Sequence, residues 1–501
     1  MDRPRCSILH VIFGCCLLAV ILAGCALLPV PTRSVRMDET GLLGNCAVFF
    51  ASLDKRIEEA GVIDPGVFRV KNYPYLRVNR LLVSFHAEVD DKTSFAAWAD
   101  RMQALDQDAR KYEIANLPFS AVVALDSTKG KAGLYNKVAA CGDLLKAADF
   151  QSTGHQLKLR ESVSVPDEYI TFRRVLGIYP LTRWFVSYGV SRWHADARKS
   201  FSAERPVNWR TIRYVSAEKI DLSLAHQIVV STKRDALGLP KYSPEELKVL
   251  FRMYAPVWEI QSQGEDDRIG TPIWIGNGVL DVDTDQPRTY TLLSFTRFRN
   301  EILTQLNYII WFPSRPKEGA WDIYGGILDG VNYRVTLDNN GEPLIYETMH
   351  NCGCYYKAYP TDRVQIRAKL DYAEPPLILK APGVNPSTDF MTVAMQSQTH
   401  YVQHLYPLSR ELQPATAVYS LVDYGQLRSL PYLKDVRRSM FSQDSIASGS
   451  RRLERFILWP TGVLSPGAMR QWGRHAVAFV GKRHFDDPFF MDRMFVETDS
   501  R

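Results

Sequence analysis

The densest group of side chains able to do chemistry lies between residues 350 and 354, which are His-Asn-Cys-Gly-Cys. If the strand that precedes this run continues through it, His350, Cys352 and Cys354 point to one face, because side chains alternate along a strand. His400 and His404 share a face of a second strand-like stretch. Thiolate and imidazole are the ligands that zinc and copper prefer, so these five residues form a candidate metal site.

Two other interpretations of Cys352 and Cys354 stay open. Gly353 between them permits a small-ring disulfide, which would be reduced more easily than an ordinary structural one. Alternatively, both residues are free thiols packed in a core. The C-x-C spacing is less specific than the paired C-x₂-C motifs of recognised zinc sites. The spacing therefore does not decide between a metal, a disulfide and free thiols.

Acidic residues give a weaker signal. Asp322 and Asp329 lie on either side of Gly325 and Gly326, and with Arg315 they could form a charged pocket. Aspartates beside glycine cap turns far more often than they catalyse reactions. We therefore interpret both aspartates as turn residues.

The N-terminus carries the most specific motif of the chain. Arg3 and Arg5 precede an apolar run from Val11 to Ile21, which is followed by the residues Leu-Ala-Gly before Cys25. This pattern resembles the lipobox of bacterial lipoproteins. The resemblance implies that residues 1–24 are a signal peptide and that Cys25 becomes the lipidated first residue. Because Ala26 follows, where an Asp would imply inner-membrane retention, we expect the periplasmic face of the outer membrane.

A lipid at Cys25 would make the membrane the first partner of this protein. At ~0.8 kcal/mol per buried methylene, two or three acyl chains form a stable anchor without a transmembrane helix. The alternative is an uncleaved N-terminal anchor, since apolar residues continue to Leu28. Pro29 and Pro31 interrupt that continuation.

The remaining cysteines fit an oxidising compartment. Besides Cys25 and the three cysteines of the predicted signal peptide, the chain has four, at positions 46, 141, 352 and 354. Cys46 and Cys141 lie in segments with helical periodicity, and their pairing would close a loop of nearly a hundred residues. Two buried thiols are the alternative.

Composition excludes several classes of protein. The 501 residues are 46% hydrophobic, which is enough for a large core and argues against intrinsic disorder. The 61 Lys and Arg residues exceed the 55 Asp and Glu residues by only six and form no dense basic block, so nucleic-acid binding is not expected. The single long apolar run, at the N-terminus, excludes a polytopic membrane protein. Nucleotide-binding P-loop and G-x-G-x-x-G motifs and the H-E-x-x-H motif of metalloproteases are not found.

The elements that must position these residues indicate an α+β fold. After a lipidated tether (25–35), we expect a mainly helical N-terminal domain (36–204), an antiparallel β-rich domain (205–430) and an irregular C-terminal extension (431–501). The sequence Asp338-Asn-Asn-Gly341 between two β-branched runs predicts a hairpin, because Asn and Gly accept positive φ. Most strand-like runs follow one another without an intervening helix, which favours antiparallel pairing.

The segment from Thr171 to Phe201 differs in composition from its surroundings. It contains seven aromatic residues and six cations but one acid, Asp196. Such a mixture suits a bilayer interface, where aromatic rings and the long side chains of arginine both find polar and apolar surroundings. Packing of the aromatic residues within the fold is the alternative interpretation, and the one we favour.

The body of the chain offers a broader resemblance. Residues 306–313, 350–354 and 470–475 resemble stretches of a group of uncharacterised proteobacterial exported proteins with no activity known to us, so no catalytic residue follows. We expect a non-enzymatic envelope or interaction protein, with an envelope protein or glycan as partner. The alternative is a metal- or thiol-dependent periplasmic enzyme, or a metal-handling protein, centred on His350, Cys352 and Cys354.

Overall fold

The computed structural model describes residues 34–498 except 127, 204–209, 218–224, 277, 320, 368–373 and 412–415. The predicted signal peptide, Cys25 and nearly all of the tether lie outside these residues. Within the described part, no helix combines the length and the apolar character needed to cross a bilayer.

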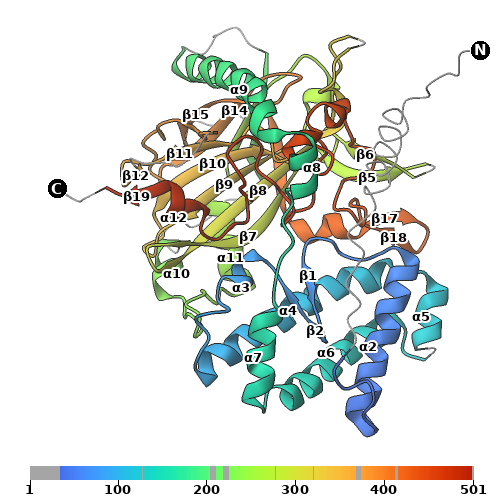
Figure 1. Cartoon of the computed structure of the whole chain (residues 1–501). Coiled ribbons are helices and arrows are strands. Elements are labelled where there is room, and N and C mark those ends of the chain that lie inside the picture. The colour runs from blue at the N-terminus through green and yellow to red at the C-terminus, as the bar shows by residue number, and fades with distance from the viewer. Residues whose placement is uncertain are drawn as a thin grey trace, which may run out of the picture.

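The N-terminal part is a cluster of helices around a small sheet, as expected from its periodicity (Figure 1). Asp91 caps the longest helix by accepting hydrogen bonds from the backbone of Thr93 and Ser94. Phe50, Leu53 and Trp98 are fully buried between the helices. The elements are α2 (Gly41–Ala60), β1 (Phe68–Val70), β2 (Tyr73–Val78), α3 (Arg80–Val83), α4 (Lys92–Asn116), α5 (Phe119–Leu125), α6 (Gly130–Asp149) and α7 (Thr153–Ser162).

A buried ion network lies inside this helical part. Arg77 of β2 donates to both carboxylate oxygens of Glu113, at 2.8 and 2.7 Å, and to Asp106 at 3.0 Å. Arg110 donates to the other oxygen of Asp106, also at 3.0 Å. Burial alone would raise the pKa of Glu113, but the charges of the surrounding arginines outweigh it and bring the pKa down to about 2. The network therefore joins α4 to β2 by buried ion pairs, in which each charged group is stabilised by an opposite charge next to it.

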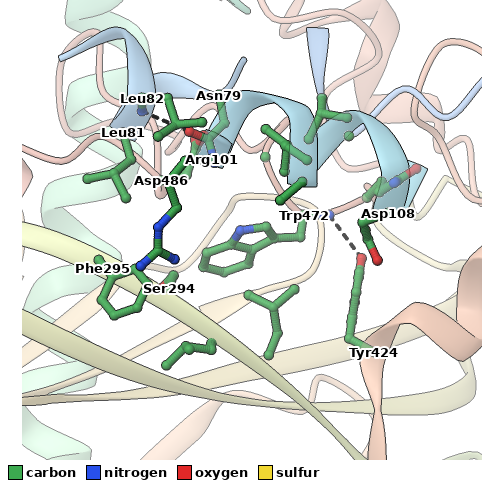
Figure 2. A pocket seen from close by; sticks show the side chains of 18 of the residues that line it. Asn79, Leu81, Leu82, Arg101, Asp108, Ser294, Phe295, Tyr424, Trp472 and Asp486 are labelled. Carbon is green, nitrogen blue, oxygen red and sulfur yellow. Dashed lines mark hydrogen bonds between the residues drawn. The ribbon is translucent and has the colours of Figure 1, made fainter. Parts of the chain in front are cut away.

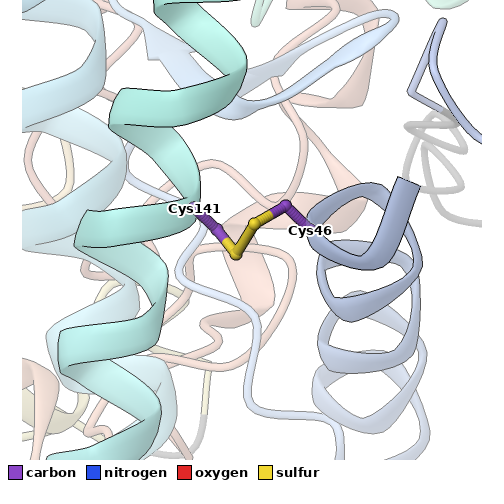
Figure 3. The surroundings of a disulfide bond; sticks show 2 residues. All are labelled: Cys46 and Cys141. Carbon is purple, nitrogen blue, oxygen red and sulfur yellow. A yellow bond between two sulfur atoms is a disulfide. The ribbon is translucent and has the colours of Figure 1, made fainter. Parts of the chain in front are cut away.

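The predicted pairing of Cys46 with Cys141 is confirmed. The disulfide joins α2 to α6 and closes a separation of 95 residues (Figure 3). On the chain-entropy model, a loop of this size stabilises the fold by about 4–5 kcal/mol.

The centre of the protein is an eleven-stranded sheet in the order β13-β11-β10-β9-β8-β7-β16-β3-β4-β14-β15. Five consecutive strands form an antiparallel meander, as predicted. The expected hairpin joins β9 to β10, with Leu337 paired to Pro343 and Gly341 at a φ of +82°. The meander consists of β7 (Arg288–Phe298), β8 (Glu301–Arg315), β9 (Gly326–Leu337), β10 (Pro343–His350) and β11 (Lys357–Pro360).

The prediction of a purely antiparallel sheet is wrong, because the other half of the sheet is mixed. β16 lies between β3 and β7 and runs parallel to both, and β14 runs parallel to β4. These partners are far apart in sequence, so no hairpin turn sets their direction. The remaining strands are β3 (Thr211–Ser216), β4 (Val257–Gln261), β13 (Leu377–Ile378), β14 (Asp389–Met395), β15 (Val402–Ser409) and β16 (Ala417–Asp423).

Further helices and small sheets surround the central sheet. Trp193, Ala197 and Phe201 of α9 pack against the apolar core that is built on the sheet. The helices are α8 (Thr171–Leu176), α9 (Tyr179–Ser202), α10 (Ala225–Ser231), α11 (Pro244–Met253) and α12 (Phe490–Met494), with short helices η2 (Glu265–Asp267), η3 (Tyr424–Arg428), η4 (Leu453–Phe456) and η5 (Trp459–Thr461). Besides β1 with β2, the described residues form three strand pairs outside the central sheet: β5 (Thr271–Ile275) with β6 (Val279–Asp283), β17 (Leu430–Leu433) with β18 (Val436–Arg438), and β12 (Val364–Ile366) with β19 (Phe495–Glu497).

The C-terminal part contacts both other parts of the chain. Arg80 of α3 pairs with Asp486 at 3.0 Å. Arg334 of β9 lies over the ring of Phe485, with its guanidinium carbon 3.6 Å from the ring centroid. This segment therefore helps to hold the helical part against the sheet.

Candidate functional site

One buried carboxylate brings together two of the predicted site histidines. Asp329 of β9 lies with Oδ2 2.8 Å from Nδ1 of His400 and with Oδ1 3.4 Å from Nδ1 of His350. The guanidinium of Arg452 lies 3.8 Å from the same carboxylate. All four side chains are buried. The sequence predicts that His350 and His400 share a site, and both lie at Asp329, which is part of β9 and not the turn residue expected from the sequence.

The pKa values of the two imidazoles are shifted in opposite directions. Burial lowers the pKa of His400, but hydrogen bonds to Asp267 and Asp329 outweigh it and raise the pKa above its usual value. For His350, burial dominates over the attraction of Asp329, and the pKa is lowered. The pKa of Asp329 falls well below its usual range, because the two histidines outweigh the effect of burial.

His350 has the geometry of an oriented base. Its Nδ1 faces the carboxylate of Asp329, and its Nε2 has no hydrogen-bond partner among the described residues. A carboxylate that fixes one ring nitrogen leaves the other free to accept a proton. The rings of Tyr355 and Tyr401 cover His350 at centroid distances of 4.9 and 5.7 Å.

The backbone around this group lies in an unusual conformation. Leu328, Tyr355 and His400 have φ angles of +56°, +59° and +53°, a region that residues other than glycine rarely occupy. Each such residue costs of the order of 1–3 kcal/mol and persists only where its surroundings hold it. Here the Asp329–His400 hydrogen bond and the stacking of His400 on Phe312, at 3.8 Å between centroids, supply those surroundings.

A second acid lies close to this group. Burial raises the pKa of the Glu454 carboxyl to about 7, against the opposing charges of Arg452 and Arg315. Carboxyls with pKa values moved in opposite directions, as in Glu454 and Asp329, are typical of acid–base sites. However, the three principal cavities of the described chain are lined by other residues. The group therefore has the donors and acceptors for proton transfer but lines none of these three cavities.

The five predicted metal ligands do not assemble. The described residues contain no group of three or more His, Cys, Asp or Glu side chains arranged to hold a metal ion. The reason is local: β10 ends at His350, and the backbone then turns tightly, with Gly353 N donating to His350 O at 2.8 Å. The assumed alternation of side chains stops there. His404 lies on β15, where its ring stacks on Phe201.

Cys352 and Cys354 are buried free thiols in the structure, so the small-ring disulfide is not formed there. Their side chains lie within an apolar cluster that includes Trp311 and Met469. A hydrogen bond with Cys352, together with burial, raises the pKa of Cys354 well above its usual value. The thiolate is the nucleophile and the metal ligand, so burial and the raised pKa disfavour both roles for Cys354.

A separate cavity of about 410 Å³ lies between the helical part and the central sheet. We call it the seam cavity. Figure 2 shows the Trp472 indole lying between α4 and β7, with its backbone N donating to the Tyr424 hydroxyl at 2.9 Å. The walls combine parts of the chain that are far apart in sequence. They include Leu81, Leu82, Arg101, Ala104, Leu105, Asp108, Leu239, Leu292, Leu293, Ser294, Phe295, Gln305, Gln471 and Gly473.

Most charges at the rim of this cavity are already paired. Arg101 donates to Asp235 at 2.7 Å, and Arg428 donates to Asp108 at 2.5 Å. Gln471 is different, because its Nε2 donates to Asp64 at 2.6 Å while its Oε1 has no partner in the described part of the chain. The cavity thus presents apolar walls and charges that are paired with one another.

Sequence reasoning missed this cavity. Residues 470–475 stood out only through their resemblance to other exported proteins, and nothing local links Trp472 to α4 or β7. Comparisons of the chain with family models, curated proteins and solved structures gave no match.

Proposed function

We propose that this protein is a lipid-anchored binding protein at the periplasmic face of the outer membrane, and that the seam cavity binds a small molecule. The observation that carries the binding role is the 410 Å³ cavity between α4, β7 and residues 471–473. Its volume lies in the range of small-molecule sites, which are mostly apolar with a few placed polar groups.

The wall chemistry narrows the class of ligand. Because the rim charges are paired with one another, a charged ligand would have to displace an existing ion pair. A neutral ligand with an apolar body would not. We therefore propose a neutral ligand with an apolar body.

The proposed role is binding rather than catalysis. The acid–base group of Asp329, His350, His400 and Glu454 does not line the seam cavity. The acid–base group thus holds β9 in place, while the cavity binds the ligand.

A filled-cavity variant tests the binding role. N-phenyl-1-naphthylamine is a neutral fluorescent probe with an apolar body and one N–H donor, so we expect it to bind the mature chain. Ala104 is exposed, lies on α4 and lines the cavity, and Ala104→Trp should fill the space and weaken probe binding by about tenfold or more. Ala96→Trp is the matched control, because Ala96 is exposed on the same helix and does not line the cavity.

Two results would overturn the binding role. The first is a mature chain that does not bind the probe. The second is an Ala104→Trp variant that binds it as well as Ala96→Trp does.

The anchor has its own test. Mass spectrometry of protein extracted from its native membrane should find a mature N-terminus at Cys25 carrying a diacylglycerol thioether. Cys25→Ala should remain unprocessed and unlipidated. An intact Met1 or an unmodified Cys25 in the wild-type protein would disprove the anchor. The binding role would be unaffected, because the probe experiment tests it independently.

A further inference from the structure

The outer face of α9 is an exposed apolar stripe. Leu181, Trp184, Phe185 and Tyr188 follow the i, i+3, i+4, i+7 pattern of one helix face, and they are 64%, 67%, 84% and 68% exposed. The opposite face carries Trp193 and other residues that pack on the sheet. The favoured expectation, that the aromatic residues of this segment pack within the fold, is therefore wrong for this stripe.

A second segment extends the stripe. Arg174 of α8 donates to the backbone O of Thr461 at 2.9 Å, which joins positions 287 residues apart in the sequence. This contact places η5 and the preceding η4 beside the junction of α8 and α9. Phe456 and Ile457, at the end of η4, are 64% and 60% exposed. Ile178, at the junction itself, is exposed as well.

A third segment lies next to η4. The backbone N of Glu454 donates to the O of Ile323 at 3.2 Å, so the loop before β9 adjoins the same surface. Trp321 in this loop is 94% exposed. We call the surface formed by residues 172–188, 321–324 and 453–457 the aromatic face. An apolar surface contributed by three segments is larger than the scattered exposed residues of an ordinary surface and marks an interaction site.

The charges around the aromatic face are mostly positive. From Thr171 to Ala195 the chain contains four arginines and no acid: Arg173, Arg174, Arg183 and Arg192. Arg455 adds a cation beside Phe456, with its guanidinium carbon 4.7 Å from the ring centroid. Of the nearby acids, Glu454 is buried, Asp322 accepts hydrogen bonds from the backbone of its own turn, and the exposed Glu318 follows the exposed Lys317.

We propose that the aromatic face docks onto an anionic phospholipid bilayer, with its rings in the headgroup region and its arginines on lipid phosphates. Trp and Tyr prefer this region because their rings are amphipathic, and arginine side chains reach from it to the phosphates. Basic residues beside an exposed apolar helix face add attraction to anionic lipids. The inference deepens the proposed membrane location by giving the protein a second contact with the bilayer that does not require Cys25.

Vesicle binding of an unlipidated chain tests this proposal. All of the buried apolar clusters described here lie between residues 46 and 495, so a chain of residues 26–501 keeps them, and its circular dichroism and thermal unfolding verify the fold. It should sediment with vesicles of phosphatidylcholine mixed with phosphatidylglycerol. Binding should be weaker on phosphatidylcholine alone and should fall as salt is added.

Substitutions on the face give the decisive comparison. Trp184→Ser with Phe185→Ser should weaken vesicle binding by about tenfold or more, because both rings leave the interface. Phe119→Ser is the matched control, since Phe119 of α5 is 82% exposed and lies outside the aromatic face. Both substitutions remove exposed rings, so neither is expected to disturb the core.

Three results would overturn the proposal. The first is a wild-type chain that binds neither kind of vesicle, and the second is a double variant that binds vesicles as well as the wild type does. The third is a wild-type chain that does not bind lipid but self-associates, with the double variant losing that self-association. The last would assign the aromatic face to contact between protein copies. The lipid anchor is tested separately from the aromatic face. If Cys25 is lipidated, full-length protein that carries the double substitution should still stay in the membrane.

Discussion

His400 Nδ1 and Asp329 Oδ2 lie 2.8 Å apart, in a hydrogen bond between two side chains that are buried from solvent. Asp329 also faces His350, whose pKa moves in the opposite direction from that of His400. One carboxylate therefore holds a histidine that favours its charged form and a histidine that favours its neutral form. The two histidines should contribute to stability with opposite dependence on pH.

We expect His400→Gln to destabilise the fold more at pH 5.5 than at pH 8.5. The folded-state pKa of His400 lies above its unfolded value of about 6.5, so its contribution is complete below that pH and is lost as pH rises through the folded pKa. Removing one partner of a buried ion pair costs about 3–5 kcal/mol. Urea unfolding followed by circular dichroism at the two pH values measures the difference.

We expect His350→Gln to show the opposite trend. The folded-state pKa of His350 is lowered, so wild-type stability falls as pH drops below about 6.5, where the unfolded chain takes up the proton. The variant lacks this penalty, and its cost should therefore be smaller at pH 5.5 than at pH 8.5. The same pH trend in both variants would show that the two imidazoles do not differ as described.

Much of the fold could be predicted because its signals are local. Turn chemistry at Asp338 and Gly341 predicts the β9–β10 hairpin, and helical periodicity around Cys46 and Cys141 predicts two helices that a disulfide can join. The insertion of β16 between β3 and β7 could not be predicted, because no local turn relates these strands.

The candidate site was predictable only in part. Alternation of side chains along a strand would group His350 with Cys352 and Cys354, but β10 ends at His350 and Gly353 adopts a φ of +93° in the turn that follows. The partner of His350 and His400 is instead Asp329, on another strand. Nothing near Asp329 in the sequence distinguishes it from a turn-capping aspartate, so only the three-dimensional arrangement reveals its role.

The disulfide should make stability sensitive to reductant. Because the bond closes a separation of 95 residues, its loss should cost about 4–5 kcal/mol. Dithiothreitol should lower the urea midpoint of the wild type. The variant with Cys46→Ala and Cys141→Ala should start from that lower midpoint and not respond to dithiothreitol. A wild-type midpoint that does not change would contradict the pairing.

Thiol titration should distinguish the two pairs of cysteines. The chain of residues 26–501 contains four cysteines, of which Cys352 and Cys354 are free and buried. We expect almost no reaction with 5,5′-dithiobis(2-nitrobenzoate) in the native state, because burial and the raised pKa of Cys354 suppress the thiolate. Unfolding without reductant should release two thiols, and reduction should release all four. No thiols after unfolding alone would indicate a disulfide between Cys352 and Cys354.

The ion network of the helical part should make Glu113 a source of acid sensitivity. Its folded-state pKa is about 2, against an ordinary value of about 4.5, so its contribution is present near neutral pH and is lost as pH falls from about 4.5 to about 2. The shift corresponds to a contribution of the order of 3 kcal/mol. Glu113→Gln should therefore destabilise the protein by this order at pH 7 and by clearly less at pH 3, measured as urea midpoints.

The control for Glu113 is an exposed glutamate in the same part of the fold. Glu59 of α2 pairs with Arg56 at the surface, where ion pairs contribute little. Glu59→Gln should leave the urea midpoint almost unchanged at both pH values.

Arg77 binds both carboxylate oxygens of Glu113, so the stability lost in Glu113→Gln should depend on Arg77. Arg77→Met should therefore destabilise the Glu113→Gln variant less than it destabilises the wild type. Additive costs of the two changes would mean that Arg77 and Glu113 contribute independently.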